Sequence, residues 1–254
     1  MTRAELLTEA KPMLFNTEMV RAILDGRKTV TRRVIKPQPK NRIAYCLGGY
    51  KCRTWGYPSQ DAYKYWGEEF KRTEQLTAEE ENRYWTPPCH TDDVLYVRET
   101  FSEVETVDGK PYYIYKADDN GAYYNHMYSS RENFEKWHPS IHMPKEAARI
   151  FLRVTGVGVE RLQDITEDGV CEEGAEPLIS CKSEHTVYYP EGGMEACFNT
   201  GCCSYCPALE ETYAELFGKL VWNKTIKSID KDIYGWDANP WVWVIEFERV
   251  EVQE

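Results

Sequence analysis

Residues 26–33 read Gly-Arg-Lys-Thr-Val-Thr-Arg-Arg, and they join an expected helix to an expected strand. Upstream, Thr17 is a candidate helix N-cap, apolar residues follow it at helical spacing, and Gly26 suits the position just after the helix end. Downstream, residues 29–35 are β-branched and alternating, which predicts a strand. The sequence therefore predicts a helix–turn–strand corner with Lys28 close to the turn.

The remainder of the chain is mostly strand-like. Short helices are expected near residues 77–84, 166–174 and 208–222, and Asp108-Gly109 suits the turn of a hairpin over residues 102–117. Further strands are expected at residues 13–15, 94–99, 149–162 and 241–250. The fold class that this pattern predicts is mainly β (α+β): a small β-barrel with interspersed short helices and large loop insertions.

The composition is that of a globular, acidic protein. The 254 residues are 42% hydrophobic and 29% charged, and the formal net charge is −11. The sequence contains no apolar run of the roughly 20 residues that a membrane helix needs, and residues 1–12 lack an apolar signal core. We therefore expect a cytoplasmic protein with no membrane partner. The acidic balance argues against general binding to a nucleic-acid backbone, because phosphates would be repelled over most of the surface.

The positive charge is concentrated in one window. Residues 27–42 contain seven basic residues and no acidic one, so this window carries +7 and the rest of the chain −18. Two interpretations are equally favoured by composition: a solvated basic face, or a surface that binds anions.

The cysteines suggest a second kind of site. Without a secretion signal, nine cysteines are expected to be free thiols or metal ligands rather than disulfides. Five of them fall within 26 residues, and Cys203-x-x-Cys206 has the spacing of a zinc knuckle. We predict a structural zinc ion bound by four cysteines, with free thiols as the alternative and Cys202 and His185 as reserve ligands. The four predicted ligands are Cys181, Cys197, Cys203 and Cys206.

Residues 26–33 resemble the signature of ASCH domains, which belong to the PUA-like β-barrel superfamily. The run Gly-Arg-Lys-Thr-x-Thr-x-Arg is similar to that of the small bacterial N(4)-acetylcytidine amidohydrolases. Residues 92–97, 162–167 and 243–247 also resemble stretches of that family in order and type. Residues 14–20, Leu-Phe-Asn-Thr-Glu-Met-Val, are similar to the opening of phage and prophage proteins of the ASCH type.

The resemblance implies one PUA-like domain over residues 1–254, with insertions at about 40–92, 110–145 and 177–207. It also implies a catalytic set in which Lys28 is the base, Thr31 the nucleophile and a distant glutamate the third member. Counting from Leu162 places that glutamate at Glu173, with Glu172 as the alternative. Four arginines would line the substrate site: Arg27, Arg32, Arg33 and Arg98.

The residues alone set conditions on such a site. In a regular strand, Lys28 and Thr31 would point to opposite faces, so Lys28 must lie in the turn before the strand, or the strand must bulge. A threonine hydroxyl is a weak nucleophile and needs an adjacent base. Burial or neighbouring cations would fit Lys28 for that role, because both lower the pKa of an amine. Without the resemblance, an exposed lysine and a packed threonine would be the default interpretation.

The predicted function is amide hydrolysis on an acylated nucleoside or nucleobase, with no organic cofactor. The alternative is a non-catalytic PUA-like module, phage-encoded in one version, that binds RNA or a modified nucleotide. The net charge of −11 favours a small ligand over a polymer. The sequence indicates neither the acyl group nor the oligomeric state.

Overall fold

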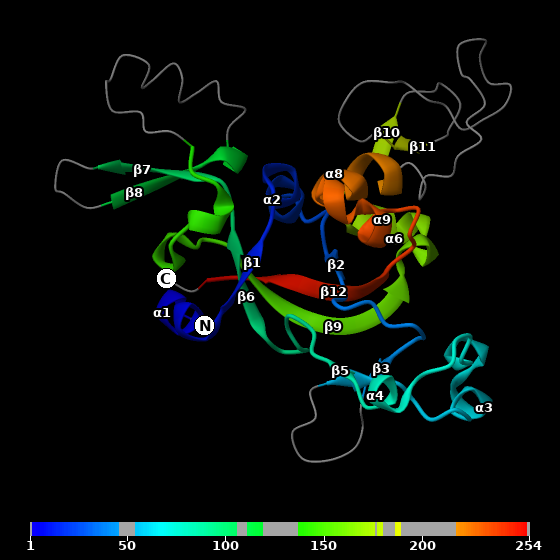
Figure 1. Cartoon of the computed structure of the whole chain (residues 1–254). Coiled ribbons are helices and arrows are strands. Elements are labelled where there is room, and N and C mark those ends of the chain that lie inside the picture. Colours follow the sequence, from blue (N-terminus) through cyan, green and yellow to red (C-terminus); the bar gives the residue numbers. More distant parts are fainter. Residues whose placement is uncertain are drawn as a thin grey trace, which may run out of the picture. The chain divides into compact units, whose positions relative to one another are not determined.

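The computed structural model describes residues 2–45, 54–105, 111–118, 137–175, 177–179, 186–188 and 217–252. They form a mixed α+β structure in which sheets predominate over helices, which confirms the predicted class (Figure 1). No closed barrel is seen among the described strands, so the PUA-like barrel stays a proposal. The chain forms two compact units. The first comprises Met1–Thr29, Thr91–Thr155 and Phe247–Glu254, and the second comprises Val30–His90 and Gly156–Glu246.

The sheet of the first unit combines parallel and antiparallel pairing. Strand β1 (Lys11–Leu14) lies parallel to β6 (Val94–Arg98), and β6 pairs antiparallel with the first part of β9 (Phe151–Arg161). The predicted hairpin is present as β7 (Phe101–Glu105) and β8 (Pro111–Tyr115), although its expected turn lies outside the described residues. The helical elements are α1 (Arg3–Glu9), α2 (Thr17–Leu24), η2 (Lys116–Asp118), η3 (Ser140–His142) and η4 (Lys145–Ala147).

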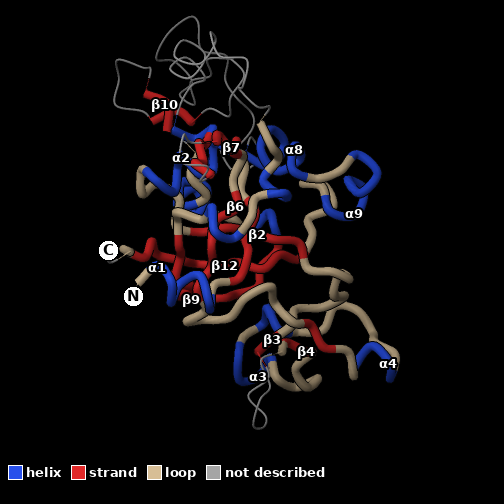
Figure 2. Tube along the Cα trace, turned by 90° about the vertical axis from the view of Figure 1, so that its left-hand side faces the viewer, coloured by secondary structure: helices blue, strands red, loops and turns tan. Residues whose placement is uncertain are grey.

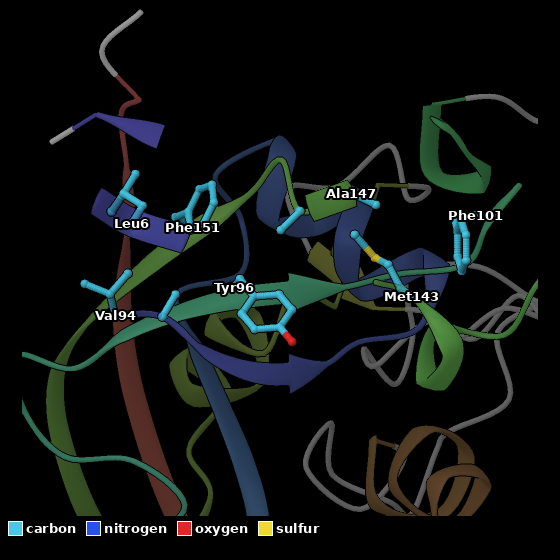
Figure 3. Close-up of a cluster of buried hydrophobic side chains, with 9 residues drawn as sticks. Leu6, Val94, Tyr96, Phe101, Met143, Ala147 and Phe151 are labelled. Atoms are coloured by element: carbon cyan, nitrogen blue, oxygen red, sulfur yellow. The ribbon is translucent and has the colours of Figure 1, made fainter. Parts of the chain in front are cut away.

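A hydrophobic cluster holds the first unit together. Helix α1 begins with a capping box between Thr2 and Glu5, which directs Leu6 into this cluster. Figure 3 shows Leu6 and Phe151 near one another, and both are 0% exposed. The buried members are Leu6, Ala10, Val94, Tyr96, Phe101, Met143, Ala147, Ala148 and Phe151.

Within the second unit, the described strands of the main sheet have the order β9-β12-β2. Strand β2 (Val30–Val34) pairs antiparallel with β12 (Trp241–Val250) and occupies the end of that order. A small sheet is formed by β3 (Ala44–Tyr45), β4 (Trp55–Gly56) and β5 (Tyr84–Trp85), and a separate pair by β10 (Pro177–Ile179) and β11 (Thr186–Tyr188). The helical elements are α3 (Tyr63–Trp66), η1 (Glu68–Phe70), α4 (Ala78–Glu81), η5 (Leu162–Asp164), α6 (Glu167–Glu172), η6 (Phe217–Trp222), α8 (Asn223–Thr225), η7 (Ser228–Asp230) and α9 (Lys231–Tyr234).

Strand alternation gives the second unit's sheet two different faces. Val34 and Val242 are paired and pack with Val170 of α6, so α6 covers their face. On the opposite face, Trp243 contacts Trp55 of the small sheet with ring centroids 5.5 Å apart. Figure 1 shows this arrangement, with α6, α8 and α9 on one side of the strands and β3 on the other, and Figure 2 agrees for α8, α9 and β3.

The helix ends of α2 and α6 lie at or next to the residues that the local sequence signals predicted. Helix α2 is capped by the side chain of Asn16, one residue before the predicted Thr17, because Asn16 accepts from the backbone N–H of Met19 at 2.8 Å. Gly26 follows the helix with φ of 75°, as expected of a residue at this position. Thr166 caps α6 as predicted. Of the helix predicted at 208–222, Phe217–Trp222 is described and is π-helical, whereas 208–216 lies outside the described residues.

Within the part of the chain that the structure describes, no helix is both long and apolar enough to cross a membrane.

Candidate functional site

Lys28 lies in the connection between α2 and β2. The backbone N–H groups of Arg27 and Lys28 both donate to the carbonyl of Ala22, at 2.9 and 3.0 Å, so the helix end fixes this turn. The Lys28 residue is only 2% exposed, and its Nζ lies 6.0 Å from the centroid of the Phe15 ring. Lys28 therefore lies after the turn and before β2, outside the regular strand, which is compatible with the first of the two alternatives that the sequence set.

Thr31 lies within β2, opposite Ile245 of β12, and is 1% exposed. Arg33 lies two residues further on, opposite Trp243. Because residues two apart in a strand share a face, the Thr31 and Arg33 side chains lie on the face that the small sheet covers. A hydroxyl, a guanidinium and an indole thus share one side of the sheet.

Glu173 is the C-cap residue of α6 and is 8% exposed. Its Oε1 accepts a hydrogen bond from the backbone N–H of Arg32 at 2.7 Å. This N–H is directed away from β12. In the antiparallel pairing, the residues on either side of Arg32 belong to the pairs that exchange backbone hydrogen bonds with β12, so the backbone groups of Arg32 point to the other side. The Glu173 carboxylate therefore occupies the outer edge of β2, one residue from Thr31. Glu172 is exposed, so burial favours Glu173 between the two alternatives.

The Arg32 side chain is engaged inside the protein. Its Nε donates to Glu160 Oε1 at 2.6 Å, and its Nη1 lies 3.3 Å from both Glu173 Oε1 and the carbonyl oxygen of Gly169. The residue is 7% exposed. The sequence predicted a substrate contact at Arg32, whereas the structure gives its guanidinium three intramolecular partners.

Arg33 contributes a second cation near Glu173. Burial lowers the pKa of Arg33, while the charge of Glu173 and the electrostatic effect of the Cys89 side chain act in the opposite direction. Cys89 itself is 0% exposed. The face that carries Thr31 therefore has a partly buried guanidinium near the carboxylate.

The remaining predicted site residues belong to the first unit. Arg27 pairs with Asp25 at 3.0 Å, and the Arg98 guanidinium donates to the carbonyl of Ile141. Lys28 is also in the first unit, whereas Thr31 and Glu173 are in the second. The convergence of Lys28 with Glu173 stays a prediction.

Glu99, next to Arg98, forms an internal salt bridge rather than a site. Its two oxygens accept from Arg149 Nε and Nη2 at 2.8 and 2.9 Å. Burial raises the pKa of Glu99, and the hydrogen bonds and charge of Arg149 oppose this shift. The Arg149 guanidinium also pairs with Asp118 and stacks 3.9 Å from the centroid of the Tyr115 ring.

The basic residues of the window at 27–42 are not all exposed. Lys28 and Arg32 are buried, so the window is not one continuous solvated face. Lys40 pairs with Glu80 at 2.8 Å, and the Arg42 guanidinium lies 5.0 Å from the centroid of the Phe70 ring. Much of the +7 is therefore neutralised or buried locally.

The predicted zinc site lies outside the described residues. This holds for Cys181, Cys197, Cys203 and Cys206, and for the reserve ligands Cys202 and His185. Over the described ranges, no group of three or more histidine, cysteine, aspartate or glutamate side chains could hold a metal ion. Cys89 and Cys171 form no disulfide bond. The zinc ion remains a prediction.

Comparisons with family models, with curated proteins and with solved structures give no match. The resemblance to ASCH domains therefore rests on the sequence stretches alone. Sequence reasoning also missed two residues of this region, Glu160 and Gly169, which contact Arg32 from β9 and α6. No motif marks either one. The alternation of β9 could place Glu160 on a face, but not opposite a particular arginine.

Proposed function

We propose that this chain is a PUA-like protein of the ASCH type that hydrolyses the amide bond of an acylated nucleoside or nucleobase. The observation that carries the proposal is the burial of Lys28, Thr31 and Glu173, which are 2%, 1% and 8% exposed. Lysine and glutamate are rarely buried to this extent unless they have a partner or a role.

Chain geometry supports the pairing of Lys28 with Thr31. They are three positions apart, so their Cα atoms lie at most about 11 Å apart whatever the backbone conformation.

The proposed reaction has two steps. The Thr31 hydroxyl attacks the acyl carbonyl, its proton passes to the Lys28 amine, and the C–N bond breaks as the leaving nucleobase amine takes up a proton. This yields a free amine and an ester on Thr31. Water then cleaves the ester, releases the carboxylic acid and restores the hydroxyl. Arg33 supplies positive charge on the face of Thr31, which would stabilise the oxyanion of each step.

The aromatic residues of the second unit support a planar ligand. Trp243 shares the Thr31 face and contacts Trp55, and Trp55 contacts Tyr45 with ring centroids 5.9 Å apart. This aromatic series runs from the buried Trp243, 4% exposed, to the surface at Tyr45, 43% exposed. Aromatic side chains of this kind stack on nucleobases.

The same aromatic series favours the second candidate, a module that binds a modified nucleotide without turnover. Stacking requires no nucleophile, and Glu173 has an intramolecular partner in Arg32. The two candidates differ in whether the acyl group is released.

The deciding experiment is a hydrolysis screen of N-acylated cytidines and cytosines, in which the release of the free amine is measured. The variants are Lys28→Met, Lys28→Ala, Thr31→Val and Thr31→Ser. Lys36→Ala is the matched control, because Lys36 is an exposed basic residue of the same window. Turnover that survives in T31S and K36A but falls at least about 10²-fold in K28M and T31V supports the proposal. Binding of the same compounds without release of product in the wild type overturns it in favour of the binding module.

A further inference from the structure

We propose that Arg32 is a positioning residue for Glu173, and that Glu160 in turn fixes Arg32. This inference rests on the proposed function, because it assigns Glu173 a role whose geometry must be held. It replaces the substrate-binding role that the sequence suggested for Arg32. All the contacts involved lie within the second unit.

Two groups of Arg32 hold the same oxygen. The backbone N–H donates to Glu173 Oε1 at 2.7 Å, and Nη1 lies 3.3 Å from that atom. The first contact comes from the backbone at the edge of β2. The second comes from the Arg32 side chain, which lies on the face of the sheet that α6 covers. An oxygen held from two directions cannot rotate about the carboxyl bond without losing one contact. Arg32 therefore fixes the orientation as well as the location of the carboxylate.

Glu160 fixes the guanidinium from the opposite side. Its Oε1 accepts from Arg32 Nε at 2.6 Å, and the Glu160 side chain is 26% exposed against 5% for Arg32 and for Glu173. The carbonyl of Gly169 receives Nη1 at 3.3 Å. One planar guanidinium thus joins β2, β9 and α6. A lysine cannot replace it, because a single ammonium cannot reach partners on different sides of the fork.

Gly169 makes room for this arrangement. A Cβ built on Gly169 would lie 3.0 Å from Arg32 Nη2 and 3.2 Å from a side-chain carbon of Ile165. Any larger residue would therefore press on the guanidinium. The close approach of the α6 backbone to Arg32 depends on glycine at this position.

The first test uses NMR and needs no activity. The amide proton of Arg32 reports directly on its hydrogen bond with Glu173. We expect its chemical shift to move upfield in Glu173→Gln, and to move part of that way in Glu160→Gln and Arg32→Lys. Glu172→Gln is the matched control, because Glu172 is an exposed neighbour on α6. An Arg32 amide that is unchanged in E160Q and R32K overturns the positioning role, whether or not the protein is an enzyme.

The second test uses the kinetics of N-acylcytidine hydrolysis. A positioning residue should lower kcat and leave KM unchanged, by about 10-fold in E160Q and about 10²-fold in R32K, since small misplacements of a reacting group are costly. In the E173Q background, R32K should cause no further loss, because there is no carboxylate left to position. A raised KM, or additive losses in the double variant, would return Arg32 to the role of a substrate contact. Absence of turnover in the wild type would overturn the proposed function and leave the NMR result to decide this inference.

Discussion

The carboxylate of Glu173 accepts a hydrogen bond from the backbone of Arg32, although 141 residues separate the two along the chain. The glutamate occupies the place where a further strand would bond to β2. Its position at the C-cap of α6 supplies this contact, because the helix ends beside the edge of the strand. A residue predicted to belong to the catalytic set is thus also a structural partner of the strand that carries Thr31.

Replacing Glu173 should therefore destabilise the fold as well as affect activity. We expect Glu173→Gln to lower the free energy of unfolding by about 1–3 kcal/mol, because it weakens a buried hydrogen bond to a charged group. Glu172→Gln, on the exposed neighbour, should change it by less than about 0.5 kcal/mol. Urea denaturation at pH 7 measures both values. Equal effects of the two substitutions would contradict the placement of Glu173 at the edge of β2.

The burial of Glu99 leads to a prediction about how the stability of the fold depends on pH. Because burial raises its pKa in the folded protein, the folded state holds this proton more tightly than the unfolded state does. Its contribution to stability is then fully present below the unfolded value of 4.5 and is lost as pH rises through the folded pKa. The difference in unfolding free energy between wild type and Glu99→Gln should shrink accordingly from pH 4 towards neutrality.

Urea denaturation across that pH range gives the difference directly. Glu103→Gln is a suitable control, because Glu103 is exposed in β7 of the same unit. A difference that grows with pH would mean that the pairing with Arg149 outweighs the cost of burial.

Gly26 should be required by the backbone rather than by packing. Its φ is 75°, and a Cβ added there would meet nothing within 4 Å. Gly26→Ala should cost about 1–2 kcal/mol, since a residue with a Cβ is strained in the left-handed region, whereas Gly26→Asn should cost less. Thermal unfolding of the two variants tests this. Equal stability of wild type and G26A would show that the turn before Lys28 relaxes without strain.

The binding of RNA, if it occurs, should depend weakly on salt. Lys28 and Arg32 are buried, so few cations of the basic window can reach phosphates. We expect the slope of log affinity against log salt to correspond to no more than about two or three phosphate contacts. Lys36→Ala should reduce this slope, and Arg32→Ala should not. RNA affinity measured between 50 and 200 mM salt gives this slope. A steep slope that R32A abolishes would mean that the Arg32 side chain is exposed and contacts phosphate.

The cysteine prediction is tested by metal analysis. If Cys181, Cys197, Cys203 and Cys206 bind zinc, protein purified without added metal should contain about one zinc ion per chain. Cys203→Ser should lose it, and Cys171→Ser, which changes a described free thiol, should not. A chelator should lower the melting temperature of the wild type only. A zinc content near zero would identify these cysteines as free thiols.

The sequence predicted the framework of the fold because each element carried its own local signal. The apolar spacing of α2, the alternation of β12 and the cap at Thr166 each depend on neighbours in the chain, and all three elements are present. The pairing of β7 with β8 also followed from adjacency. Short aromatic strands such as β4 were missed, because two residues give no periodicity.

The candidate site was predictable only in part. Strand geometry set two alternatives for Lys28, a place before the strand or a bulge, and the choice of Glu173 over Glu172 came from counting along a resembling stretch. The bonds from Arg32 to Glu160 and Glu173 could not be foreseen, because they join residues 128 and 141 positions apart through folded geometry alone. Composition suggested that Arg32 faces solvent, but a buried arginine between two carboxylates has the same sequence signature as an exposed one.

The bond between Glu173 and the outer edge of β2 also has a consequence for self-association. An edge strand with unpaired N–H groups invites another chain to add to the sheet. Here an incoming strand would have to displace a carboxylate that is attached to its own helix, and it would bring its carbonyl oxygens against that negative charge. The α6–β2 contact thus opposes the pairing of a second copy of the chain with this edge strand. The variant Glu173→Ala would lack this protection against self-association.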